Sequence, residues 1–215
     1  MTAERRVKFS RMADGDQDDF ALLDQHERAS AKAVGQRLLA TLEMLDDAPS
    51  AYRVSRSEHS LQCATRAWFD GADSDWIAAA LLHDIGDILA PYNHDEYAAA
   101  VLRPYLREQC TWVVRHHGIF QRYYYAHQFG GDREARRKYR DNDYFDDAVA
   151  FCERWDQASF DPSFVSLPMD HFRPLVDEVF SREPYAACNI LPAVRLPLVD
   201  ARKAASRRND AVSAA

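Results

Sequence analysis

The chain has 215 residues, of which 47 % are hydrophobic, and contains only seven glycines and nine prolines. This length and composition suit one domain with a sizeable core and argue against a loop-rich or all-β protein. A formal net charge of −7 excludes a broadly basic surface, so no nucleic-acid partner is expected. The sequence has neither a signal-peptide pattern nor an apolar run long enough to cross a bilayer. We therefore expect a cytoplasmic protein that does not associate with membranes.

Apolar residues recur at helical spacing along most of the chain, and almost no period-two alternation is visible. The fold class expected is therefore all-α. The predicted helices span residues 18–45, 57–67, 76–83, 94–106, 110–127, 144–156 and 172–182. We expect Ser57 to cap the second of these, Asp73 or Ser74 to cap the third, and Gly118 to interrupt or bend the fifth.

The polar ends of the sequence set the predicted domain boundaries. Residues 1–16 are expected to be flexible, and residues 201–215 are expected to form a disordered tail. A single helical domain should occupy residues 17–200. The four cysteines are widely spaced and form no CxxC pair, which excludes a dithiol motif and is typical of buried thiols in a reducing compartment.

The apolar stretch ALLHDIGD ends abruptly in His83 and Asp84, and His94 follows ten residues later. Adjacent helical residues point about 100° apart, so this pair cannot chelate one ion from a regular helix face. At a helix end, however, His83 can bind one ion while Asp84 bridges to a second. The alternative is an unusually polar helix end without any metal.

Other predicted helices carry further imidazole and carboxylate groups. Counting them in order gives four imidazoles and two carboxylates, which can serve two six-coordinate ions that share Asp84. Such a donor set suits iron or manganese, with other divalent metals as alternatives. The predicted metal ligands are His59, His83, Asp84, His94, either His116 or His117, and Asp156.

The order of these residues, with LLHDIGD at its centre, resembles the HD-domain superfamily of helical metal-dependent enzymes over roughly residues 50–160. Several segments are similar to the mixed-valent di-iron oxygenases of that superfamily, which cleave organophosphonates or oxidise myo-inositol. The matching segments are VSRSEHSLQCATRA, NHDEYAAAVLRPY, VVRHHGIFQRYY and CERWDQASFDP. The resemblance implies a compact HD-domain helical bundle with additional terminal helices. It also implies two iron ions, Fe²⁺ and Fe³⁺, and favours His117 over His116 as the fourth imidazole, although the sequence permits either.

By that resemblance the protein is expected to use O₂ to oxidise or cleave a C–H, C–C or C–heteroatom bond of a small polar substrate chelated to iron. The catalytic residues would be Asp84 and Asp87. The substrate pocket would contain Tyr52, Gln62, Asp87, Gln121, Tyr124 and Glu153. The phosphonate-cleaving enzymes carry basic residues at the positions of Gln121 and Glu153, so their substrate does not transfer. Acidic groups with tyrosines instead suggest an amine-bearing substrate, which cation–π contacts would help to hold.

A metal-dependent phosphohydrolase acting on a nucleotide or phosphate ester could use the same ligands, with metal-bound hydroxide as its nucleophile. It would need cations for the phosphate, and Arg115, Arg122 and Arg154 are the candidates from the sequence. A structural metal site is a third alternative. It is less favoured because the predicted site leaves coordination positions open, whereas structural metal sites tend to be closed.

Overall fold

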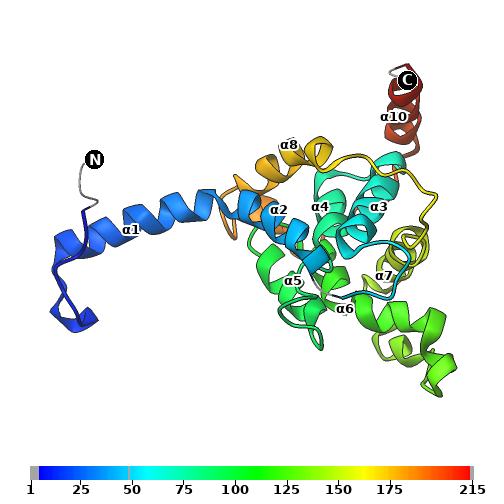
Figure 1. Ribbon diagram of the computed structural model, residues 1–215, viewed down its shortest axis with the longest axis horizontal. Coiled ribbons are helices and arrows are strands. Elements are labelled where there is room, and N and C mark those ends of the chain that lie inside the picture. The colour runs from blue at the N-terminus through cyan, green and yellow to red at the C-terminus, as the bar shows by residue number, and fades with distance from the viewer. Residues whose placement is uncertain (1–4, 48, 214–215) are drawn as a thin grey trace.

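The computed structural model describes residues 5–47 and 49–213, and this part of the chain contains helices and no β-strand (Figure 1). The all-α expectation is confirmed. The α-helices are α1 (Gln17–Lys32), α2 (Val34–Met44), α3 (Arg56–Phe69), α4 (Ser74–Leu82), α5 (His94–Leu102), α6 (Glu108–Tyr125), α7 (Phe145–Phe151), α8 (Met169–Phe180), α9 (Ala187–Ile190) and α10 (Ala201–Ser213). The short elements are η1 (Met12–Asp14), η2 (Leu45–Asp47), η3 (Ala126–Phe129), η4 (Ala135–Tyr139) and the π-helical turn η5 (Cys152–Asp156).

Helix α4 lies at the centre of the bundle, in contact with α3, α6 and α8. Every residue from Trp76 to Leu82 is completely buried, as expected for a helix that is apolar on all sides. Each large side chain buried here contributes about 1.5–3 kcal/mol to folding. Asp73 accepts a hydrogen bond from the Trp76 amide at 3.0 Å, which confirms one of the two predicted caps. Burial of α4 therefore fixes where its polar end emerges.

Two local expectations were wrong. Helix α3 is capped by Ser55, whose Oγ accepts from the Glu58 amide at 3.1 Å, because the Ser57 hydroxyl instead donates to Asp46. Helix α6 runs without interruption through Gly118. A Cβ at Gly118 would lie 3.2 Å from Asp95 Oδ2, so this glycine permits a close approach of α5 rather than a bend.

The predicted helix at 18–45 is two helices, with Ala33 between them. Helix α2 packs on α8 and buries three leucines, Leu38, Leu39 and Leu42. Residues 24–33 lack a comparable apolar stripe, and α1 extends away from the bundle (Figure 1). The two segments therefore follow different directions, since only one of them has a face to bury.

The C-terminal segment forms a helix. Helix α10 covers most of residues 201–215, for which the sequence predicts disorder. Arg207 anchors it by donating to the carbonyls of Trp68 and Ala72 and by stacking 3.8 Å above the Trp68 ring. Residues 214–215 lie outside the described residues, as do residues 1–4. Flexibility of the N-terminal segment stays a prediction.

Candidate metal centre

Five parts of the chain converge at one end of α4 and bring all six predicted metal ligands together. His59 comes from α3 and His117 from α6, while His83 and Asp84 directly follow α4. His94 begins α5, and Asp156 is the last residue of the π-helical turn η5. Side chains separated by up to 97 positions in the sequence thus face one another.

Gly86 is required for this convergence. A Cβ at this position would lie 2.9 Å from the His94 carbonyl oxygen, so a larger residue would push the start of α5 away from the His83–Asp84 turn. The close approach places His94 beside Asp84. A buried helix end followed by a glycine is therefore the local feature that delivers three of the six side chains.

The carboxylate of Asp84 divides its two oxygens between two pairs of imidazoles. Oδ2 lies 3.5 Å from His59 Nε2 and 3.4 Å from His83 Nε2. Oδ1 lies 3.4 Å from His94 Nε2 and 3.1 Å from His117 Nε2. This is the arrangement that a carboxylate needs to bridge two cations.

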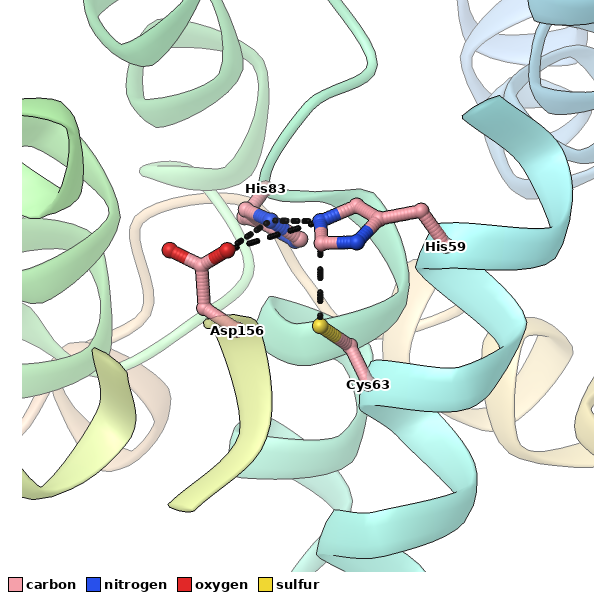
Figure 2. Close-up of side chains that lie close together, drawn as sticks. All are labelled: His59, Cys63, His83 and Asp156. Atoms are coloured by element: carbon pink, nitrogen blue, oxygen red, sulfur yellow. Dashed lines mark hydrogen bonds and ion pairs between the residues drawn. The ribbon is translucent and has the colours of Figure 1, made fainter. Parts of the chain in front are cut away.

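One imidazole pair forms a buried half of the centre together with Asp156 (Figure 2). The Nε2 atoms of His59 and His83 are only 3.2 Å apart. Asp156 Oδ1 lies 3.5 Å from the first and 3.7 Å from the second. The Sγ atom of Cys63 lies 3.9 Å from His59 Nε2 on another side of the ring. The second pair, His94 and His117, completes a half that faces a cavity.

The other ring nitrogens determine which atoms can bind a metal. Nδ1 of His59, His83 and His117 lies 2.9, 2.9 and 2.7 Å from the carbonyl oxygens of Ser159, Ala80 and Val114. Each Nδ1 must carry the proton to donate to a carbonyl, which leaves an Nε2 lone pair directed into the centre. Hydrogen bonding of this kind orients imidazoles for metal binding.

Charge in the cluster changes several pKa values. Burial alone would lower the pKa of His83, but Asp84 and Asp156 outweigh burial and raise it. Burial likewise opposes protonation of His117, and the neighbouring Asp84 nevertheless raises its pKa. Burial raises the pKa of Asp84, but the surrounding imidazoles dominate and hold it well below the ordinary value. The centre therefore strongly favours bound positive charge.

The donor set fits a pair of metal ions. The lone pairs of His59 and His83 face each other at 3.2 Å, which is unfavourable unless a cation or proton lies between them. Asp156 Oδ2 and Gln121 Oε1 are buried oxygens that accept no hydrogen bond from the described residues. Nitrogen and carboxylate oxygen are suitable ligands for divalent and trivalent first-row metals.

A cavity of about 560 Å³ opens onto the centre, and all of the proposed ligands except His83 line it. Three predicted pocket residues line it, namely Tyr52, Asp87 and Gln121. Tyr125, one of the tyrosines considered for the pocket, also lines it, whereas sequence reasoning missed Arg56, Phe129 and Phe160. Arg56 precedes His59 by one helical turn, which was the available signal. Phe160 stacks on the His59 ring at a centroid distance of 4.3 Å, a contact that the sequence does not reveal.

Three other predicted pocket residues do not line this cavity. Gln62 is a buried residue of α3 that donates to the Asp161 carbonyl, and Glu153 is exposed on η5. Tyr124 packs against the core, and burial raises its pKa to about 12. The π-helical turn explains the position of Glu153, because it changes which side chains share a face with Asp156.

The structure distinguishes the two adjacent histidines of α6. His117 faces Asp84, whereas His116 packs between Trp112 and Tyr139 and its Nδ1 lies 2.8 Å from the Trp112 carbonyl. The cations predicted for a phosphate do not line the cavity. Arg115 pairs with Glu96 and Arg154 with Asp70 on the outer surface.

Comparison with known protein families identifies the region that contains the centre. Residues 56–156 match the HD domain family, from the first residue of α3 to the last residue of η5. This segment is similar to HD domains. Proteins of that family are generally metal-dependent enzymes, commonly phosphohydrolases. No curated protein matches the chain. Within the described residues, each helix is too short or too polar to span a membrane.

Proposed function

We propose that this protein is a non-haem di-iron oxygenase that uses O₂ to oxidise or cleave a bond of a small polar substrate. The observation that carries the proposal is the division of the Asp84 oxygens between two imidazole pairs. In this assignment His59, His83 and Asp156 hold one ion, His94 and His117 hold the other, and Asp84 bridges them. Manganese or another divalent metal is the alternative occupant.

The ion pair would supply redox chemistry and a binding position for chelating groups of the substrate. The chain provides the surroundings. Gln121 donates to Asp156 Oδ1 at 2.9 Å and thereby fixes that carboxylate. Tyr52, Tyr125 and Phe160 line the cavity with aromatic rings, and the ring centroids of Tyr52 and Phe160 lie 4.9 Å apart. These contacts favour an organic substrate of modest size.

Asp87 is the proposed acid–base group of the cavity. Burial and the neighbouring negative charge of Asp84 raise its pKa, so this carboxyl group holds a proton more readily than an exposed one. Its Oδ1 lies 3.4 Å from His94 Nδ1, and its Oδ2 accepts a hydrogen bond from Arg56 at 3.2 Å. Because Arg56 already pairs with the Asp87 carboxylate, Asp87 is less suited to binding an ammonium group of the substrate. Tyr123 is unsuitable for that role too, since Arg133 and Arg136 already lie over its ring.

The cavity also bears on the choice between oxygenase and hydrolase. Among the described residues that line it, Arg56 is the one arginine or lysine, and it is already paired with Asp87. The other side chains that line the cavity include several acidic and aromatic ones. A phosphate dianion would rely almost entirely on the metal ions for its positive charge. This composition favours a neutral or zwitterionic substrate.

The deciding experiment measures iron content and low-temperature EPR on protein purified without oxygen and then partly oxidised. We expect about two irons per chain and a coupled mixed-valent signal that changes when candidate hydroxy acids, polyols or amino alcohols are added. Oxygen uptake should accompany the compounds that change the signal. The Asp84→Asn variant is the control, because it keeps the size of the side chain and weakens the bridge.

Metal-dependent phosphohydrolysis is the second candidate, favoured by the HD domain match. In that case the same protein would release phosphate from nucleotides or phosphate esters equally well with and without oxygen. Redox-silent ions that support such turnover, together with no oxygen uptake, would replace the oxygenase proposal with this one.

A further inference from the structure

One potential ligand of the buried half belongs to none of the predicted metal positions. Cys63 follows His59 by one turn of α3, and its side chain is completely buried. Its Sγ atom, one nitrogen each of His59 and His83, and one oxygen of Asp156 all lie within 4.8 Å of one another. Figure 2 shows the sulfur and the Asp156 carboxylate approaching the two imidazoles from different sides.

The distances are compatible with an ion shared by these atoms. Metal–nitrogen bonds to histidine are about 2.0–2.1 Å and metal–sulfur bonds about 2.3 Å, so a nitrogen and a sulfur on one ion lie at most about 4.4 Å apart. The observed separation of 3.9 Å between His59 Nε2 and Cys63 Sγ falls within that limit. The separation of 3.2 Å between the two Nε2 atoms does so too.

Among the described residues, the other half of the centre has no such donor. Asp84, Asp87 and His94 form one group of potential ligands there, and His117 Nε2 lies 3.1 Å from Asp84 Oδ1. Nitrogen and oxygen atoms are therefore the donors at the cavity-facing position. The two halves differ in chemical softness as well as in burial.

We propose that Cys63 Sγ is an additional ligand of the buried ion, which makes that position selective for thiophilic metals. The sulfur–hydrogen bond gives up its proton to solvent as the metal–sulfur bond forms, and no electron is transferred. Cobalt, zinc and iron can all accept a thiolate, whereas magnesium and manganese bind it poorly. The inference rests on the dinuclear site of the proposed function, but not on its oxygen chemistry.

Cobalt titration of the metal-free protein tests this ligand directly, because a thiolate bound to Co²⁺ gives a near-ultraviolet charge-transfer band. We expect that band in the unaltered protein and its loss in Cys63→Ala. Removing a residue that only hydrogen-bonds to a metal ligand typically lowers metal affinity by ~10–100-fold. Loss of the ligand Cys63 should lower the cobalt affinity of the buried position by at least that much. Cys63→Ser provides a second variant with nearly unchanged volume.

Cys110→Ala is the matched control, since this thiol is buried and lies outside the donor group. It should retain the charge-transfer band. A band that survives in Cys63→Ala would overturn the proposal. Bound cobalt with visible ligand-field bands but no charge-transfer band in the unaltered protein would overturn it as well, while leaving the dinuclear site intact. Failure to bind cobalt at all would instead reject the dinuclear site and this inference together.

Discussion

The two halves of the centre differ in how firmly the fold holds them. In the buried half, the side chains of His59, His83 and Asp156 have exposed fractions of 5 %, 0 % and 3 %. In the cavity-facing half, the His117 side chain is equally buried at 3 %, whereas His94 is 25 % exposed. Buried imidazoles with both ring nitrogens engaged are costly to move, whereas a partly exposed one can exchange partners with solvent. This contrast suggests a permanent ion beside an exchangeable one.

The largest effect should come from the residue common to both halves. Asp84→Asn removes the negative charge that holds the two ions together, so we expect loss of about one ion per chain and a fall in turnover on the order of 10³-fold. Metal analysis after gel filtration and activity assays measure both. Asp141→Asn, at an exposed carboxylate that does not line the cavity, should change neither. Two tightly bound ions in Asp84→Asn would disprove the bridge.

A smaller effect, on the free energy of unfolding of the metal-free protein, should differ between the two halves. His83→Ala leaves a fully buried gap and an unpaired Ala80 carbonyl, so it should lower the free energy of unfolding by about 2–4 kcal/mol. His94→Ala alters a partly exposed side chain and should cost less than about 1 kcal/mol. Urea denaturation in the presence of a chelator provides both values. Equal losses would remove the distinction between a rigid and an exchangeable half.

The pH dependence should follow from the raised pKa values of His83 and His117. In metal-free protein, protonation of these rings contributes stability that is complete below their unfolded pKa near 6.5 and is lost as pH rises through the raised folded values. A metal ion replaces those protons. The increase in Tm caused by metal should therefore grow from about pH 6 to pH 8. A constant increase over this range would contradict proton–metal competition.

The smallest effects on turnover concern the pocket. Asp87→Asn removes the proposed acid–base group, so it should lower kcat for any compound that supports oxygen uptake by about 100-fold, and loss of one charge-assisted hydrogen bond should raise KM by about tenfold. Glu153→Gln should leave KM unchanged, because Glu153 is exposed and does not line the cavity. Steady-state kinetics on the two variants provide the comparison. A larger change for Glu153→Gln would mean that the substrate extends beyond the cavity.

Helical periodicity and the HD pattern made the fold class and the six proposed ligands accessible from the sequence. They were accessible because ligands at helix ends appear as polar interruptions of apolar runs, as His83 and Asp84 do after α4. The break between α1 and α2 at Ala33 and the continuity of α6 through Gly118 were not accessible from the sequence, because local helix propensity determines neither of them. Gly118 lies where another helix approaches, and only the packed structure reveals that neighbour.

Only some of the predicted pocket residues line the cavity, again because packing between distant segments decides which side chains face it. Tyr52, Asp87 and Gln121 line the cavity as predicted, while Gln62, Tyr124 and Glu153 face elsewhere. A position in the sequence near a ligand does not determine the direction of its side chain, particularly where a π-helical turn changes the rotation per residue. The i, i+4 spacing of His59 and Cys63 was visible in the sequence, but their approach to Asp156 was not.

The sequence by itself determined which kinds of donor atoms the protein carries and that helices present them, because both follow from residue type and short-range spacing. Tertiary structure alone decided how the donors divide into a buried half with sulfur within reach and an open half beside a cavity. That division depends on contacts between α3, α4, α6 and η5, segments separated by tens of residues. Packing over such distances is set by the whole core, and local sequence patterns do not encode it.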